Sequence, residues 1–379
     1  MITNDNGYGT PALPNITSLR FFLALLVVIF HIASFSEKRG FPHFDSLPVF
    51  NRGIEAVYMF FSLSGFLIIR NLFHEKKKTG KISITNFYMK RVLRIFPLYY
   101  AVLFFGLFYY NFLMPRLGIE TGQMECTLPQ ALLLGGTFFS NILATFNPGG
   151  IIEILWSIGI EEQFYLLVAP LLFLLPLKNI WLFLAAFTMF YFALFHLRIP
   201  DFLMKYHMFF YYFSFSGLLA ISKSNMNGRL AMFFKLLVFA LVILYFTTNL
   251  FKSNFSYTLY QFISMVLFGT FIKLFSAQPI AFFQKSFLVY LGKISYGIYM
   301  LHAIAMHMAA FAFIKTNAVN FISGKAVFII AFNIITISLT LFMAHCSYKY
   351  FETYFLRLKP ASAQSKAAPE LAANTAERD

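Results

Sequence analysis

The stretch LRFFLALLVVIFHIASF, residues 19–35, places a guanidinium and an imidazole among apolar side chains. Arg20 opens this run and His31 lies inside it, eleven residues later. Eleven residues make about three helical turns, so both side chains project from one face, roughly 16 Å apart along the axis. Taken singly, Arg20 fits a snorkelling interface anchor and His31 fits a hydrogen-bonded core residue. Their shared face favours a functional polar surface on this helix, because burying ionisable groups at membrane depth is energetically unfavourable.

The composition predicts a membrane protein. Of the 379 residues, 59% are hydrophobic and 12% are charged, and the mean hydropathy is +0.70. Soluble domains carry about 25% charged residues. A chain of this length can supply about ten spanning helices of roughly 20 residues each. We therefore expect an all-α polytopic membrane protein.

The net charge of +15 does not indicate nucleic-acid binding, because the basic residues lie in short connectors. HEKKKTGK (74–81) is an example, and such loops are typical of the cytoplasmic side of a membrane. No basic helix with interleaved aromatic residues lies outside the apolar runs, as a nucleic-acid surface would require. Two cysteines are too few for a disulfide framework or a zinc site. We expect neither a metal nor a nucleic acid as partner.

Eleven apolar runs are candidate membrane spans. Dense Lys and Arg over 74–94 place that loop, and the N-terminus two crossings earlier, in the cytoplasm. The run 128–147 contains two glycines and two asparagines and is followed by Pro-Gly-Gly, which is typical of a re-entrant or interfacial helix. If it does not cross, the basic cluster at 349–359 is cytoplasmic too. We therefore predict ten crossings, over 19–36, 53–73, 95–114, 156–176, 180–197, 205–222, 230–248, 257–276, 288–313 and 325–350.

Both ends of the chain are expected to lie outside the membrane domain, which we place at 16–357. Residues 1–15 are polar and contain no Lys or Arg, so they lack the basic region of a secretory signal and form a cytoplasmic segment. The end of the chain, PASAQSKAAPELAANTAERD (360–379), is rich in Ala, Ser and Pro and lacks aromatic residues. This composition predicts a disordered cytoplasmic tail over 358–379.

Two apolar runs carry acidic residues. RGIEAVYMFFSLSGFLI (52–68) places Glu55 near the outer end of a helix and Ser64 deeper, where small residues also serve close helix packing. LWSIGIEEQFYLL (155–167) carries two adjacent carboxylates, Glu161 and Glu162, which point about 100° apart on a helix. At least one of the two must face a cavity or a basic partner, either in the reaction or in a buried ion pair.

A pair of arginines and a histidine complete the set of candidates. Arg91 and Arg94 share a helix face in FYMKRVLRIFPLYY (87–100), at the expected cytoplasmic edge. They fit lipid head-group anchors or a clamp for a phosphate-bearing ligand, because guanidinium forks bind phosphate bidentately. YLGKISYGIYMLH (290–302) brings His302 into a later helix, either as a packed core histidine or as part of a cavity.

Together and in this order, these motifs resemble the acyltransferase 3 family of integral membrane acyltransferases. The resemblance runs from about Ile16 to about Phe355 and ends in YKYFETYF (348–355), where members usually carry a Glu at the position of Glu352. The sequence departs from the family at Glu55, where many members have Asp, and at Gly159, where members have a second small or polar residue.

The resemblance implies an O-acyltransferase of the bacterial inner (plasma) membrane with both termini in the cytoplasm. Members move an acyl group, often acetyl, from cytoplasmic acyl-CoA to a hydroxyl of an extracytoplasmic acceptor, commonly a cell-surface or lipid-linked carbohydrate. His31 matches the essential histidine and Arg20 its partner, and Arg91 with Arg94 matches the arginine pair linked to the donor. Acyl-CoA (acetyl-CoA) is then a co-substrate, and no cofactor stays bound.

Two other classes of membrane protein would also contain such buried charges. A transporter or flippase of a polar or lipid-linked substrate needs no basic histidine, and neither does an inactive scaffold. An imidazole suits proton abstraction from a hydroxyl near neutral pH, which favours the acyltransferase. We expect His31, Arg20, Glu161 and Glu162 to be catalytic. Candidates for the cavity and the acceptor site are Glu55, Ser64, Trp156 and His302.

Overall fold

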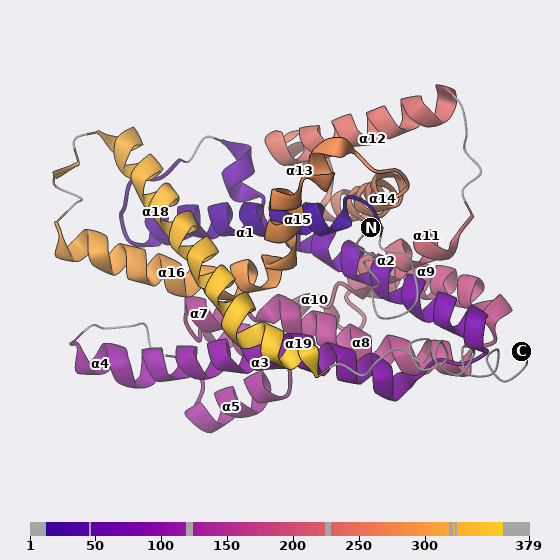
Figure 1. The fold of residues 1–379 in the computed structure, drawn as a ribbon, viewed down its shortest axis with the longest axis horizontal. Helices are drawn as coiled ribbons and strands as arrows, with labels where there is room; N and C mark the ends of the chain where they lie inside the picture. Colours follow the sequence, from indigo (N-terminus) through magenta and orange to yellow (C-terminus); the bar gives the residue numbers. More distant parts are fainter. Residues whose placement is uncertain are drawn as a thin grey trace, which may run out of the picture.

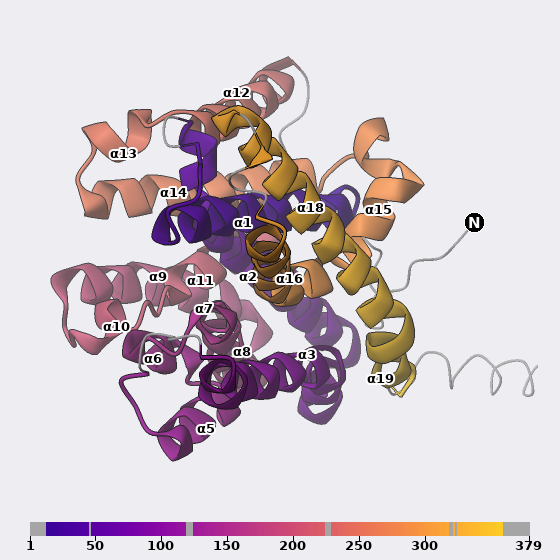
Figure 2. The same ribbon diagram turned by 90° about the vertical axis from the view of Figure 1, so that its left-hand side faces the viewer.

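The computed structural model describes residues 13–44, 47–118, 124–223, 229–317, 321–322 and 324–358. The segment predicted over 1–15 lies outside these residues up to position 12, and so does the predicted tail from position 359 onward. The described residues form helices and no strand (Figures 1 and 2). The predicted all-α polytopic membrane fold is therefore confirmed.

Eight of the described helical segments are long and apolar enough to cross a membrane. They are built on α1 (Ile16–Lys38), α2 (Gly53–Thr79), α3 (Ile84–Phe108), α8 (Trp156–Leu174), α9 (Ile180–Leu197), α14 (Tyr257–Phe275), α16 (Ser295–Lys315) and α18 (Lys325–Cys346). Two further apolar helices are α11 (Phe210–Ile221) and α12 (Arg229–Thr247). These ten helices coincide with the ten predicted spans, and the number of crossings itself stays a prediction.

The segment 128–147 contains no helix that could cross. It forms α5 (Leu128–Gly136), α6 (Ser140–Leu143) and a 3₁₀ turn (Ala144–Phe146). The nine residues of α5 rise about 14 Å, half of a hydrocarbon core about 30 Å thick. Tyrosine hydroxyls of α3 donate to the carbonyl oxygens of its last two residues, over 2.7 and 2.8 Å. The protein thus satisfies backbone groups that lipid could not.

Several helices differ from the predicted bounds: α2 ends at Thr79 instead of 73, and α11 begins at Phe210 instead of 205. Three further differences lie near the site. The run 288–313 is divided at Ile294 into α15 (Ser286–Lys293) and α16. The helix predicted over 95–114 begins eleven residues earlier, at Ile84, so Arg91 and Arg94 both lie within α3, and their place at the cytoplasmic edge of the membrane stays a prediction. The last apolar helix, α18, continues as a π-helix (Ser347–Glu352) and then as α19 (Thr353–Arg357). All three differences bear on the site described below.

Helix α2 lies at the centre of the bundle. Of its apolar window, 72% is buried in the protein, against 22% for α9 and 28% for α18, which present their apolar side chains outward. It packs on α1, α8, α11 and α14. Gly65 permits the closest of these approaches, because a Cβ there would collide with the backbone of Phe213 on α11. Figure 1 shows α1, α3 and α16 running in roughly the same direction, α2 slanting toward the lower right, and α18 crossing α16 obliquely.

Candidate active site

A cavity lies where α1, α2, α3, α8 and α16 meet. Helical spacing explains why single elements contribute pairs of side chains: Arg91 and Arg94 are about one turn apart on α3, as are Tyr296 and Tyr299 on α16. The polar lining consists of Arg20, Ser64, Arg91, Arg94, Ser157, Glu161, Tyr165, Ser295, Tyr296 and Tyr299. Candidate residues from four separate sequence motifs therefore share one cavity.

Glu161 is held at both carboxylate oxygens. Its Oε1 accepts a hydrogen bond from the hydroxyl of Ser64 over 3.0 Å, and its Oε2 accepts one from Tyr165 over 2.8 Å. Tyr165 stands one turn after Glu161 on α8, while Ser64 reaches it from α2. The carboxylate thus ties two helices together and has a fixed orientation toward the cavity.

The arginines give the cavity its basic character. Within the part of the chain that the structure describes, neither Arg20 nor Arg94 forms an ion pair or a hydrogen bond. Arg91 lies over the ring of Tyr165, with 5.3 Å from its guanidinium carbon to the ring centroid. Each of these guanidinium groups repels the others, and Glu161 attracts both Arg20 and Arg94. With three guanidinium groups and one carboxylate, the cavity lining has a net positive charge, which favours the binding of an anion.

A second carboxylate, that of Glu352 in the segment after α18, attracts the guanidinium of Arg94. The π-helix after α18 delivers it, and such π segments are frequent at functional sites. The side chain is buried and accepts a hydrogen bond from the hydroxyl of Ser347 over 3.0 Å. Gly297 of α16 makes room for it, because a Cβ there would lie 3.2 Å from its Oε1.

His31 does not line this cavity. Its Nδ1 lies 2.9 Å from the carbonyl oxygen of Val27, and its ring lies against that of His302, with 4.9 Å between centroids. The two residues on the predicted common face of α1 therefore have different surroundings. Arg20 joins the two arginines of α3, and His31 joins a histidine of α16, three helical turns away.

The other candidates lie outside the cavity lining. Glu162 is buried outside the cavity lining, within reach of the charge of Arg91, and its Oε1 has no hydrogen-bond partner among the described residues. Trp156 packs edge-on against Phe61 and His207, with ring centroids 6.0 and 5.7 Å away. Of the two adjacent carboxylates, Glu161 is thus the one that faces the cavity.

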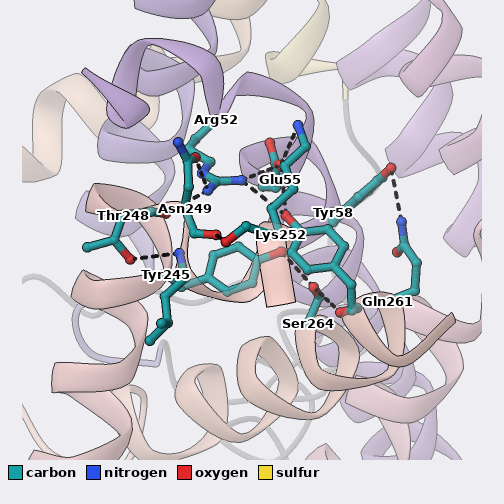
Figure 3. A network of polar contacts seen from close by, with 12 residues as sticks. Arg52, Glu55, Tyr58, Tyr245, Thr248, Asn249, Lys252, Gln261 and Ser264 are labelled. Atoms are coloured by element: carbon teal, nitrogen blue, oxygen red, sulfur yellow. Dashed lines mark hydrogen bonds and ion pairs between the residues drawn. The ribbon is translucent and has the colours of Figure 1, made fainter. Parts of the chain in front are cut away.

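Glu55 belongs to a separate buried network (Figure 3). Its Oε1 accepts hydrogen bonds from the Arg52 guanidinium over 3.0 Å and from the Tyr260 hydroxyl over 2.8 Å. Arg52 also donates to Thr248 and Asn249, in the corner that joins α12 to the next helix. The network links two corners of the bundle.

Sequence reasoning missed five residues as members of the site: Ser157, Tyr165, Ser295, Tyr296 and Tyr299. These residues lie in LWSIGIEEQFYLL (155–167) and YLGKISYGIYMLH (290–302), and their spacing of one helical turn from Glu161 or from one another could have identified them. In the described part of the chain no three His, Cys, Asp or Glu side chains form a group that could hold a metal, and Cys126 and Cys346 are both free.

Comparisons with known proteins identify the family of this chain. A family model described as an acyltransferase domain, that of acyltransferase 3, matches residues 13–345. The peptidoglycan O-acetyltransferase OatA of Listeria monocytogenes is 27% identical over 177 residues, which is 45% of this chain and 26% of that protein. The O-acetyltransferase OatA of Staphylococcus aureus is 30% identical over 165 residues, 42% of this chain and 24% of that protein.

The match with the ORF330 protein of Acidianus two-tailed virus is longer, at 26% identity over 311 residues, 77% of this chain and 82% of that protein. This chain therefore spans about a quarter of the length of the two OatA relatives and most of the viral one. No solved structure matches the chain.

Proposed function

Because this chain belongs to the acyltransferase 3 family, we propose that it moves an acetyl group from cytoplasmic acyl-CoA to a hydroxyl of an extracytoplasmic carbohydrate. The family and the named relatives support acyl transfer to oxygen, and the name of the Listeria relative supports a glycan acceptor. The apolar helices support an integral membrane location. We place the protein in the bacterial inner membrane with a cell-surface or lipid-linked glycan as acceptor.

The observation that carries the proposal is the arginine cavity. Arg20 and Arg94 lack hydrogen-bonding partners among the described residues, and the positive charge of Arg91 repels both. Unpaired guanidinium groups in a membrane domain are unfavourable unless a ligand compensates them. The phosphates of CoA are suitable, because arginine forks bind phosphate bidentately. We therefore assign donor binding to Arg20 and Arg94, and to Arg91 the positive charge that it adds beside them.

The distance between the arginines and His31 fits the shape of this donor. Arg20 and His31 are roughly 16 Å apart along α1. CoA carries its thioester at the end of a long pantetheine arm, away from its phosphates. With the phosphates at Arg20 and Arg94, the arm would extend along α1 and bring the thioester toward His31.

His31 is the base in this scheme. Its Nδ1 faces a backbone carbonyl, which accepts only, so Nδ1 carries the proton and Nε2 holds the free electron pair. Nε2 takes the proton of the acceptor hydroxyl as the oxygen attacks the thioester carbon. The carbon–sulfur bond breaks, and the proton passes to the CoA thiolate. The products are an acetyl ester and CoA, and no further reactant is needed.

Radiolabelled acetyl-CoA added to the protein in liposomes tests the proposal. Label should pass to a glycan acceptor in the opposite compartment with wild-type protein. With the His31→Ala variant transfer should fall to a small residual rate, although CoA binding should remain because His31 lies outside the arginine cavity. A transporter or flippase would move the acceptor without labelling it. Substantial transfer by His31→Ala would contradict the assignment of the base.

A further inference from the structure

His302 is a buried histidine with one ring nitrogen left over. Its side chain is 1% exposed, and its Nδ1 lies 2.5 Å from the carbonyl oxygen of Tyr299. A carbonyl oxygen only accepts, so Nδ1 carries the proton and Nε2 holds a lone pair. This Nε2 has no hydrogen-bond partner among the described residues. A buried polar atom left without a partner is unfavourable and calls for an explanation.

The ring that lies against His302 belongs to His31. The two centroids are 4.9 Å apart with an angle of 49° between the planes, which is the spacing of aromatic rings in contact. Both rings give their Nδ1–H to a carbonyl oxygen of their own helix, Val27 in one case and Tyr299 in the other. In the resting protein the pair therefore offers two Nε2 lone pairs and no proton between them.

We propose that His302 is a positioning residue that accepts a hydrogen bond from His31 after His31 has taken the proton of the acceptor hydroxyl. This inference rests on the proposed function. A protonated imidazole has two N–H donors, and each needs an acceptor in a buried site. Val27 accepts from one and the Nε2 of His302 accepts from the other. The proton stays on His31 in this hydrogen bond until it passes to the CoA thiolate.

A pair of substitutions of similar length separates this role from packing. His302→Gln places an amide oxygen where Nε2 lay, whereas His302→Met fills the space without a comparable acceptor. A charge-assisted hydrogen bond present only after proton transfer should affect turnover and not substrate binding. We expect kcat to fall on the order of 10- to 100-fold in His302→Met, with KM for acetyl-CoA and for the acceptor unchanged. His302→Gln should keep kcat within about threefold of the wild type.

His307 provides the matched control on the same helix. Its Nδ1 lies 2.8 Å from a carbonyl oxygen of its own helix, but its Nε2 has a partner, the Tyr110 hydroxyl at 3.4 Å. His307→Met should therefore keep the wild-type kcat. Equal losses in His302→Met and His302→Gln, or in His307→Met, would overturn the proposal in favour of packing.

The His31→Ala variant distinguishes the two levels of inference. If His302 acts only through His31, adding His302→Met to His31→Ala should cause no further loss of the residual rate. A multiplicative loss would contradict this coupling. If wild-type protein transfers no acetyl group, the proposed function itself fails. If it does transfer and His302→Met retains the wild-type kcat, only the role of His302 fails.

Discussion

Arg20 and Arg94 are the two cavity arginines that form no ion pair or hydrogen bond with the described residues. If they bind phosphate, replacing either by Lys keeps the charge but removes the planar fork. We expect the Kd for CoA to rise about tenfold in Arg20→Lys and in Arg94→Lys, the size of one lost charge-assisted hydrogen bond. Calorimetry on the purified protein measures this, with His31→Ala as the variant that should keep its affinity. An unchanged Kd in both Lys variants and in the Arg91→Ala, Arg94→Ala double variant would make these arginines lipid anchors.

The two neighbouring carboxylates of α8 should behave differently. Glu161 accepts hydrogen bonds from Ser64 and Tyr165 at the cavity, whereas Glu162 lies outside it. Glu161→Gln keeps the size of the side chain and removes the charge that offsets the arginines. We expect its turnover to fall at least about tenfold, and Glu162→Gln to stay near the wild-type rate. Normal expression of both is the control, and the reverse order would show that the wrong carboxylate has been assigned.

These residues also show what a sequence can predict. The step of about 100° between Glu161 and Glu162 predicted that one of them faces inward, but only the packing of α8 against α2 selects Glu161. The shared face of Arg20 and His31 was predicted correctly in the same way. It said nothing of their neighbours, because the arginines of α3 and the histidine of α16 approach α1 at different depths.

At the scale of the elements, the Arg52 network fastens the start of α2 to the end of α12. Removing one partner of a buried pair leaves the other charge uncompensated, which costs about 3–5 kcal/mol. We expect Arg52→Met to lower the free energy of unfolding in mixed micelles by that amount. Lys252 is the matched control, since it is 60% exposed and 4.0 Å from Glu55. Lys252→Met should change the stability by less than about 1 kcal/mol, and equal losses in the two variants would refute a specific role for Arg52.

One helix boundary was predicted from composition and another was missed. Glycines, asparagines and a Pro-Gly-Gly sequence marked 128–147 as unable to cross, and the structure contains only short helices there. The break at Ile294 was not predicted, although Gly292, Lys293 and Ser295 surround it, because the apolar run resumes directly after them. It follows from tertiary contact: Gly292 of α15 lies so close to Thr17 of α1 that a Cβ would collide with its carbonyl. Such an approach cannot be read from the sequence of either helix alone.

At the scale of the whole molecule, contacts between helix ends constrain the topology. Lys76, at the end of α2, donates hydrogen bonds to the carbonyl oxygens of Leu172, Phe173 and Leu175, at the end of α8. Helix ends that touch must lie on the same side of the membrane, so an even number of crossings separates them. The helices α3 and α8 supply two, and a crossing by 128–147 would make three. The contact of Arg52 with Asn249 excludes the same extra crossing by the same argument.

The last prediction follows from this parity. The ten predicted crossings would return the chain to the side on which it starts, and the basic residues that follow α2 predict that this side is the cytoplasm. A phosphatase fused after Arg357 should therefore be inactive in cells, and a fluorescent protein at the same point should fluoresce. A fusion after Gly80 should behave in the same way, whereas one in the connector that follows Asn317 should show the opposite pattern. An active phosphatase after Arg357, with an inactive one after Gly80, would mean an odd number of crossings between them and would refute the contact argument above.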